Sequence, residues 1–160
     1  MPRFKKIKFD GATVTLEWTD GGRKWEKVEV FTGRELPHPD FTAALAACVP
    51  VVLDLLELPD EYAHGMTVRG VSLSVDDEGH EGAVVTCLKA LDAVPAPLVL
   101  NTPHVSTREN AEGEPSMPDA LGDALETIKR EAQCYLAGGK RAQADLFSDA
   151  EIDAAEAAGV

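Results

Sequence analysis

Residues 3 to 18 read Arg-Phe-Lys-Lys-Ile-Lys-Phe-Asp-Gly-Ala-Thr-Val-Thr-Leu-Glu-Trp and indicate the fold class of the chain. Apolar and polar residues alternate on both sides of Asp10-Gly11, which is the period of β-strands with one buried face. Asp-Gly is a favoured turn between two antiparallel strands. The stretch therefore predicts a β-hairpin, with Ile7 on one face of its first strand and Phe4 on the other.

A third strand is expected directly after this hairpin. The turn residues Asp20-Gly21-Gly22 precede residues 24 to 31, a segment with the composition of a strand. Val28 and Val30 are expected to face inward. Because short turns join the three strands, they should form an antiparallel meander.

A second hairpin is predicted in the middle of the chain. Residues 66 to 75 alternate, an acidic turn reverses the chain, and residues 83 to 90 return as a nearly continuous apolar run. Such a run is typical of a strand that is buried on both faces. Residues 98 to 100 lie between two prolines and are expected to form a short edge strand.

Two segments have the spacing of helices. Residues 39 to 57 carry apolar residues at helical intervals, but Pro50 falls inside the pattern and is expected to kink or divide the helix. Residues 118 to 137 follow the three-then-four spacing of an amphipathic helix. The glycines at 138 and 139 are expected to end it.

These elements predict a single α+β domain over residues 1 to 137. A mostly antiparallel sheet, built from the three-stranded meander and the second hairpin, is covered by two main helices. Residues 138 to 160 are expected to form a flexible C-terminal tail, in which Ser148 and Glu151 make a capping box for a short terminal helix. The polar loop over residues 101 to 116 is long enough to be either functional or disordered.

Composition restricts the class of protein. The 160 residues are 44% apolar, which is typical of a globular domain, and their net charge of −13 opposes non-specific binding to nucleic acid. The amino terminus lacks the apolar segment of a secretion signal, so we expect a cytoplasmic protein without membrane contact. Cys48, Cys87 and Cys134 lack the paired spacing of a disulfide framework or a zinc site and are expected to be core residues.

The tail contains the sequence Gln143-Ala144-Asp145-Leu146-Phe147. Leu146 and Phe147 are adjacent apolar residues in a polar context, which suits the insertion of an extended peptide into a pocket. The amide of Gln143 can donate and accept hydrogen bonds that fix the register of this insertion. The alternative is that Leu146 and Phe147 pack against the domain itself.

These residues resemble the motif Gln-x-[Asp/Ser]-Leu-Phe, by which bacterial polymerases and their accessory factors dock on the β sliding clamp. The resemblance implies clamp binding through Gln143, Asp145, Leu146 and Phe147. It also implies an accessory protein of bacterial or phage DNA replication, recombination or repair. The resemblance is confined to these five positions.

A second candidate site lies in the meander, where basic residues stand near Phe4, Trp18 and Trp25. Cations that hold the phosphate backbone, combined with rings on which bases stack, are typical of surfaces that bind single-stranded DNA. The candidate residues of this nucleic-acid interface are Lys6, Lys8, Lys24, Trp25 and Lys27. The alternative is that the lysines serve solubility and discourage edge pairing.

The sequence has no catalytic signature, and we expect no catalytic residue, metal or cofactor. Four histidines fall in predicted loops without the spacing of a metal site, namely His38, His64, His80 and His104. An acidic turn offers oxygen ligands but lacks the spacing of a calcium loop, and it consists of Asp76, Asp77 and Glu78.

Two alternative functions stay open. One is an acidic inhibitor of the clamp or a DNA mimic, which the net charge of −13 favours. The other is a small enzyme that acts on nucleotides or nucleic acid, with a site assembled from the loops.

Overall fold

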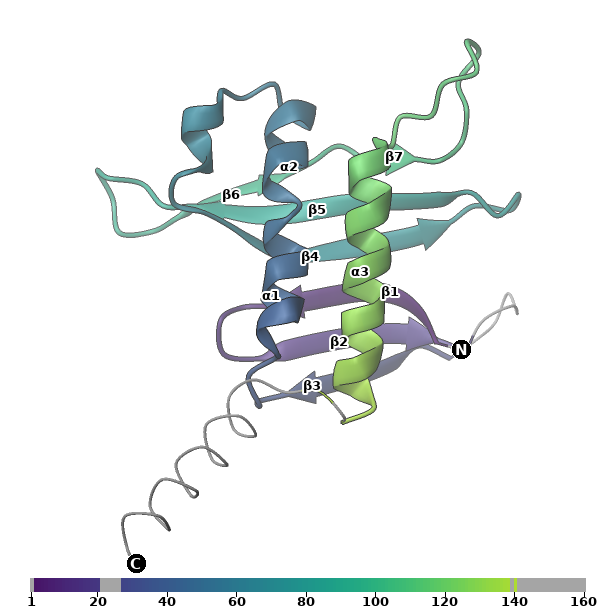
Figure 1. The fold of residues 1–160 in the computed structure, drawn as a ribbon, viewed down its shortest axis with the longest axis horizontal. Coiled ribbons are helices and arrows are strands. Elements are labelled where there is room, and N and C mark those ends of the chain that lie inside the picture. Colours follow the sequence, from purple (N-terminus) through teal and green to yellow (C-terminus); the bar gives the residue numbers. More distant parts are fainter. Residues whose placement is uncertain (1, 21–26, 139, 141–160) are drawn as a thin grey trace, which may run out of the picture.

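The computed structural model describes residues 2–20, 27–138 and 140. They form two layers, an antiparallel seven-stranded sheet and a set of helices that lie across one of its faces (Figure 1). Among the described residues, no helix covers the opposite face. The predicted α+β class, with a meander and a second hairpin beneath two main helices, is confirmed.

The strands are arranged in the order β3-β2-β1-β4-β5-β6, and β7 also pairs with β5. Pairing of β1 with β4 joins the meander to the second hairpin, and β6 confirms the predicted edge strand. The strand bounds are β1 Arg3–Phe9, β2 Val14–Thr19, β3 Glu29–Gly33, β4 Met66–Val75, β5 Glu81–Lys89, β6 Leu98–Asn101 and β7 Val105–Ser106.

The side chain of Asp10 closes the first hairpin. Its Oδ1 accepts hydrogen bonds from the backbone amides of Ala12 (2.8 Å) and Thr13 (2.7 Å). Gly11 has a φ of 97°, a conformation that glycine adopts without steric cost. The predicted turn is therefore confirmed, with the aspartate side chain replacing a backbone acceptor.

The prediction that Phe4 and Ile7 lie on opposite faces of β1 is wrong. The register of β1 against β2 shifts between Phe4 and Lys6, so an extra residue interrupts the alternation. Phe4 consequently lies on the core side with Ile7, and its ring contacts Trp18 edge-on at a centroid distance of 6.5 Å. Strict alternation of side chains cannot predict a bulge, because one extra residue in the strand exchanges the two faces for all residues beyond it.

The prediction that Val28 and Val30 face inward is also wrong. Val28 and Val30 are 42% and 59% exposed. Phe31 packs against the core instead, because it lies opposite the buried Leu16 of β2. Pairing with β2 therefore decides which face of β3 is covered.

Within the described residues, the strand β5 is covered on one face only. Its core-facing residues Ala83, Val85 and Cys87 are buried, whereas Val84 and Thr86 between them are half-buried. The prediction of burial on both faces is wrong, because the helices occupy a single side of the sheet. An apolar run alone does not report how many layers cover a strand.

The first predicted helix is divided into α1 (Pro39–Ala46) and α2 (Val49–Leu55). Pro50 lacks the N–H that would bond to Ala46, and its ring would clash with that carbonyl. Pro50 lies in the first turn of α2, where no such hydrogen bond is needed. A short 3₁₀ helix, η1 (Asp60–Ala63), follows before β4.

The second predicted helix is α3 (Asp119–Leu136), which packs against α1. Gly138 follows it with a φ of 79°, the left-handed conformation that ends many helices, and this confirms the predicted stop. The buried face of α3 contains the predicted stripe, except for the partly buried Leu136, together with Ala124 and Glu131. It comprises Leu121, Ala124, Leu125, Ile128, Glu131, Ala132 and Tyr135.

One hydrophobic core lies between the sheet and the helices, with buried apolar residues from Phe4 to Tyr135. Cys48 and Cys87 belong to this core, and burial raises the pKa of their thiols to about 12 and about 11, respectively. Cys134 is only half-buried. In the described part of the chain, no helix has the length and apolar character needed to cross a membrane.

Candidate functional site

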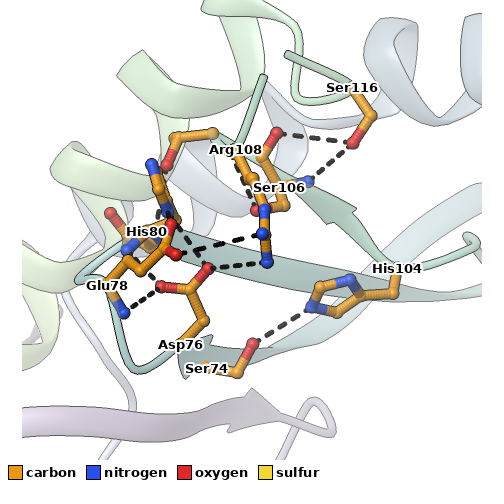
Figure 2. A network of polar contacts seen from close by, with 10 residues as sticks. Ser74, Asp76, Glu78, His80, His104, Ser106, Arg108 and Ser116 are labelled. Atoms are coloured by element: carbon orange, nitrogen blue, oxygen red, sulfur yellow. Dashed lines mark hydrogen bonds and ion pairs between the residues drawn. The ribbon is translucent and has the colours of Figure 1, made fainter. Parts of the chain in front are cut away.

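A hollow of about 550 Å³ lies beside the turn between β4 and β5, where β7 and the following loop meet the hairpin (Figure 2). Most of the side chains that line the hollow are polar. They come from segments that are distant in sequence. The lining residues are Ser74, Asp76, His80, Gly82, His104, Ser106, Arg108, Glu109, Asn110 and Ser116.

Asp76 and His80 form the turn at one side of this hollow. Asp76 Oδ1 accepts hydrogen bonds from the amides of Glu78 (2.9 Å) and His80 (2.8 Å), and Oδ2 lies 3.1 Å from Nδ1 of His80. The amide of His80 is the largest of the influences that hold the pKa of the Asp76 carboxyl below its usual value of 3.8. Asp76 is therefore ionised at neutral pH, and its carboxylate already accepts hydrogen bonds within the turn.

Arg108 brings a positive charge to the same turn from the loop after β7. Its guanidinium nitrogens lie 4.0 Å from carboxylate oxygens of Asp76 and Glu78. The Arg108 side chain is 61% exposed, so solvent screens these contacts and they add little stability. The guanidinium can therefore turn toward a bound anion at low cost.

The long polar loop after β6 has a regular internal structure. The side chain of Asn110 accepts hydrogen bonds from the amides of Glu112 (2.8 Å) and Glu114 (3.1 Å). Ser116 Oγ accepts a hydrogen bond from the amide of Ser106 at 2.8 Å, which joins the two ends of the loop. These bonds hold the loop as a hairpin-like wall of the hollow.

His104 and Ser74 form the opposite wall (Figure 2). Ser74 Oγ lies 3.1 Å from Nε2 of His104, which is hydrogen-bond distance. The imidazole lies against Gly82, where a Cβ atom would come within 2.3 Å of Nε2. Gly82 therefore leaves the space for this Ser–His pair, a combination that nucleophilic enzymes use.

The structure brings two of the four histidines, His80 and His104, to one hollow. His38 instead caps α1, since its Nδ1 accepts a hydrogen bond from the amide of Asp40 at 3.1 Å. His64 lines a different depression beside η1. Sequence reasoning missed this convergence, although an aspartate four residues before a histidine in a predicted turn is a usable signal.

The hollow is suited to a small polar ligand because it presents hydroxyl, imidazole, amide, guanidinium and carboxylate groups together. Within residues 2–20, 27–138 and 140, no group of three or more His, Cys, Asp or Glu residues is placed to hold a metal ion. The carboxylate of Asp76 accepts hydrogen bonds from its own turn. Its surroundings therefore favour hydrogen bonding over cation coordination.

The lysines of the predicted nucleic-acid interface are only partly described. Lys6 and Lys8 lie on the uncovered face of the sheet, opposite Glu17 and Thr15 of β2, and Lys6 Nζ is 3.5 Å from the Glu17 carboxylate. Lys27 lies 3.9 Å from a carboxylate oxygen of Glu29. These two acidic neighbours reduce the positive potential that a phosphate backbone requires.

The described aromatic residues of the predicted interface do not lie beside its lysines. Phe4 and Trp18 pack on the core side of the sheet, so their rings are not presented beside Lys6 and Lys8. Lys24 and Trp25 lie outside the described residues. The nucleic-acid interface therefore stays a prediction that depends on Trp25.

The clamp-like residues Gln143, Asp145, Leu146 and Phe147 and the predicted terminal helix also lie outside the described residues. The last described residue is Lys140. Its Nζ donates hydrogen bonds to Asp40 Oδ2 (2.8 Å) and Glu131 Oε1 (2.9 Å). Lys140 therefore lies beside the start of α1 and the last turns of α3.

No family model, curated protein or solved structure matches this chain.

Proposed function

We propose that this protein is an accessory factor of bacterial or phage DNA replication, recombination or repair that docks on the β sliding clamp. The observation that carries the proposal is the sequence Gln143-Ala144-Asp145-Leu146-Phe147. In this proposal Leu146 and Phe147 insert into an apolar pocket of the clamp, where adjacent desolvated anchors supply most of the binding energy. Gln143 fixes the register by hydrogen bonding.

The position of Lys140 supports this use of the tail. The buried apolar residues of the described part lie between Phe4 and Tyr135, so a core is already built ahead of the motif. Lys140 is bonded to Asp40 and Glu131, and only two residues separate it from Gln143. The motif thus begins within about 11 Å of Lys140, and the domain would lie close beside the clamp.

Binding of a peptide spanning residues 140 to 148 to a bacterial β clamp tests the proposal. We expect a Kd on the order of 1 µM, or about 8 kcal/mol, measured by titration calorimetry. Replacing Leu146 and Phe147 together by Ala should abolish binding, because both anchors are lost. Gln143→Ala should weaken binding by about 1 to 3 kcal/mol.

The matched control is Ala144→Ser, at the position of the motif that accepts any residue. This peptide should bind as tightly as the parent. If the parent peptide does not bind the clamp, the resemblance is accidental and the proposed function is wrong.

An accessory factor and an acidic inhibitor would both occupy the clamp. The net charge of −13 is the observation that favours the inhibitor, since such a body repels DNA. Clamp-dependent DNA synthesis with the full chain distinguishes the two: an accessory factor sustains or stimulates synthesis, whereas an inhibitor arrests it.

The hollow beside β7 favours a second candidate function, a small enzyme that acts on nucleotides or nucleic acid. Its supporting observation is the Ser74–His104 pair next to Arg108 and His80. A phosphate group would find the guanidinium and hydroxyl donors that it prefers. Such an activity would survive replacement of Leu146 and Phe147, whereas a clamp-dependent function would not.

A further inference from the structure

A groove of about 630 Å³ runs between α1 and α3 on the outer side of the helical layer. Its apolar lining consists of alanines, with Ala44 and Ala124 buried and Ala43, Ala47 and Ala120 exposed. Because alanine side chains are short, the two helices leave room for larger apolar groups between them. The volume is in the range of ligand sites, which is about 300 to 1,000 Å³.

The end of the described chain lies at the mouth of this groove. Lys140 is bonded to Asp40 and Glu131, and both of these acidic residues line the groove. The two ion pairs measure 2.8 and 2.9 Å, and the Glu131 side chain is only 8% exposed. The groove therefore begins where the tail begins.

The length of the tail matches the length of the groove. Along α3 the lining extends from Ala120 to Glu131, which is about 17 Å of helix. Seven residues from Arg141 to Phe147 reach at most about 25 Å when extended. Leu146 and Phe147 can therefore reach the alanine-lined part of the groove while Lys140 stays bonded.

The acidic residues at the beginning of the groove complement the basic start of the tail. Lys140 is basic and is bonded to Asp40 and Glu131, and the next residue in the sequence, Arg141, is basic as well. Arg130, which precedes Glu131 on α3, lines the same end of the groove, and Asp123 lines it farther along. The opposite charges of Lys140, Asp40 and Glu131 would hold the start of the tail at this end of the groove.

We infer that the groove between α1 and α3 holds the chain's own clamp-binding segment, so that the domain and the clamp compete for Leu146 and Phe147. The competition rests on the proposed function, whereas the docking of the tail does not. A tail that is docked nine-tenths of the time would bind the clamp about tenfold more weakly than the free peptide. Arrival at a clamp would then displace the tail from the groove.

Amide chemical shifts of the full chain test the docking without any clamp. The wild type and the Leu146→Ala/Phe147→Ala double variant should differ at groove residues such as Ala43, Ala124 and Thr127. Val99 and Thr86, which lie outside the groove, should keep their shifts. If the groove residues also keep their shifts, the tail does not dock there and the inference is overturned.

Clamp affinity of the full chain then tests the competition. Ala43→Phe fills the groove from an exposed position of α1 and should raise the affinity about tenfold, to that of the free peptide. Ala46→Phe is the matched control, because Ala46 is exposed on the same helix but does not line the groove. An equal effect of both substitutions would overturn the competition.

The two proposals fail separately. Groove shifts together with a peptide that does not bind the clamp would uphold the docked tail and reject the clamp function. If the peptide binds the clamp but the groove residues of the full chain keep their shifts, the clamp function is upheld and the docked tail is rejected.

Discussion

Single polar side chains set the turns of this protein. Asp10 and Asp76 each use a carboxylate oxygen to accept two backbone amides within a hairpin turn. Asp76 additionally contacts the imidazole of His80. Because these contacts stabilise the ionised carboxylate, the pKa of Asp76 is lowered and part of the fold's stability becomes dependent on pH.

Asp76→Asn tests this contribution. A lowered pKa in the folded state stabilises the fold above the unfolded value of 3.8, and that stabilisation is lost as the pH falls through the folded value. The variant should therefore have a lower free energy of unfolding than the wild type at about pH 7, and the difference should shrink toward about pH 3. Urea unfolding at both pH values measures this difference.

The control for this experiment is Asp77→Asn, which removes the same charge from the exposed neighbouring residue. Its free energy of unfolding should stay within about 0.5 kcal/mol of the wild type. Equal losses in both variants would mean that net charge, rather than the turn, is responsible.

At the scale of elements, α3 organises the helical layer. The ring of Tyr135 packs against Phe31 of β3 and Phe41 of α1 at centroid distances of 6.3 and 6.2 Å. Its hydroxyl donates a hydrogen bond to the carbonyl of Glu35 at 2.6 Å, and Gly33 leaves room for that approach. The end of α3 is thus attached to the connection between β3 and α1.

Tyr135→Phe should weaken this attachment while keeping the ring contacts. Loss of one hydrogen bond should lower the free energy of unfolding by about 0.5 to 1.5 kcal/mol, measured by urea denaturation. Tyr62→Phe is the matched control, because Tyr62 is 43% exposed on η1 and should tolerate the change. A larger loss from Tyr62→Phe would contradict this account of α3.

At the scale of the whole molecule, the described part of the chain places its helices on one face of the sheet and none on the other. The helices lie on one face of the sheet, and Lys6, Lys8 and Thr15 belong to the other. The groove on the helical layer and the hollow beside β7 are lined by different residues. Docking of the tail and binding of a small ligand, as proposed above, would therefore use separate surfaces.

A chain that ends at Lys140 tests whether the domain is complete without the motif. It retains α3, Gly138 and the ion pairs of Lys140 with Asp40 and Glu131. Its melting temperature should lie within about 4 °C of the full chain, which is equivalent to about 1 kcal/mol for a domain of this size. A drop of more than about 10 °C would mean that residues after Lys140 belong to the core.

The sequence by itself determined the elements that depend on local physics. Period-two alternation identified β1, β2 and β4, and a continuous apolar run identified β5. Pro50 divided the first helix because proline cannot donate a hydrogen bond, and the stripe that begins at Leu121 marked α3. The clamp-like motif is likewise a property of consecutive residues. Its use remains a prediction.

Only the tertiary structure decided which faces are buried and which loops meet. The bulge after Phe4 and the pairing of Phe31 with Leu16 assigned the core faces, because burial depends on the partner strand as well as on the residue. The meeting of Ser74 with His104, thirty positions apart, follows from the pairing of β7 with β5. Such a contact has no local signal, since it requires strands that are distant in sequence to pair side by side.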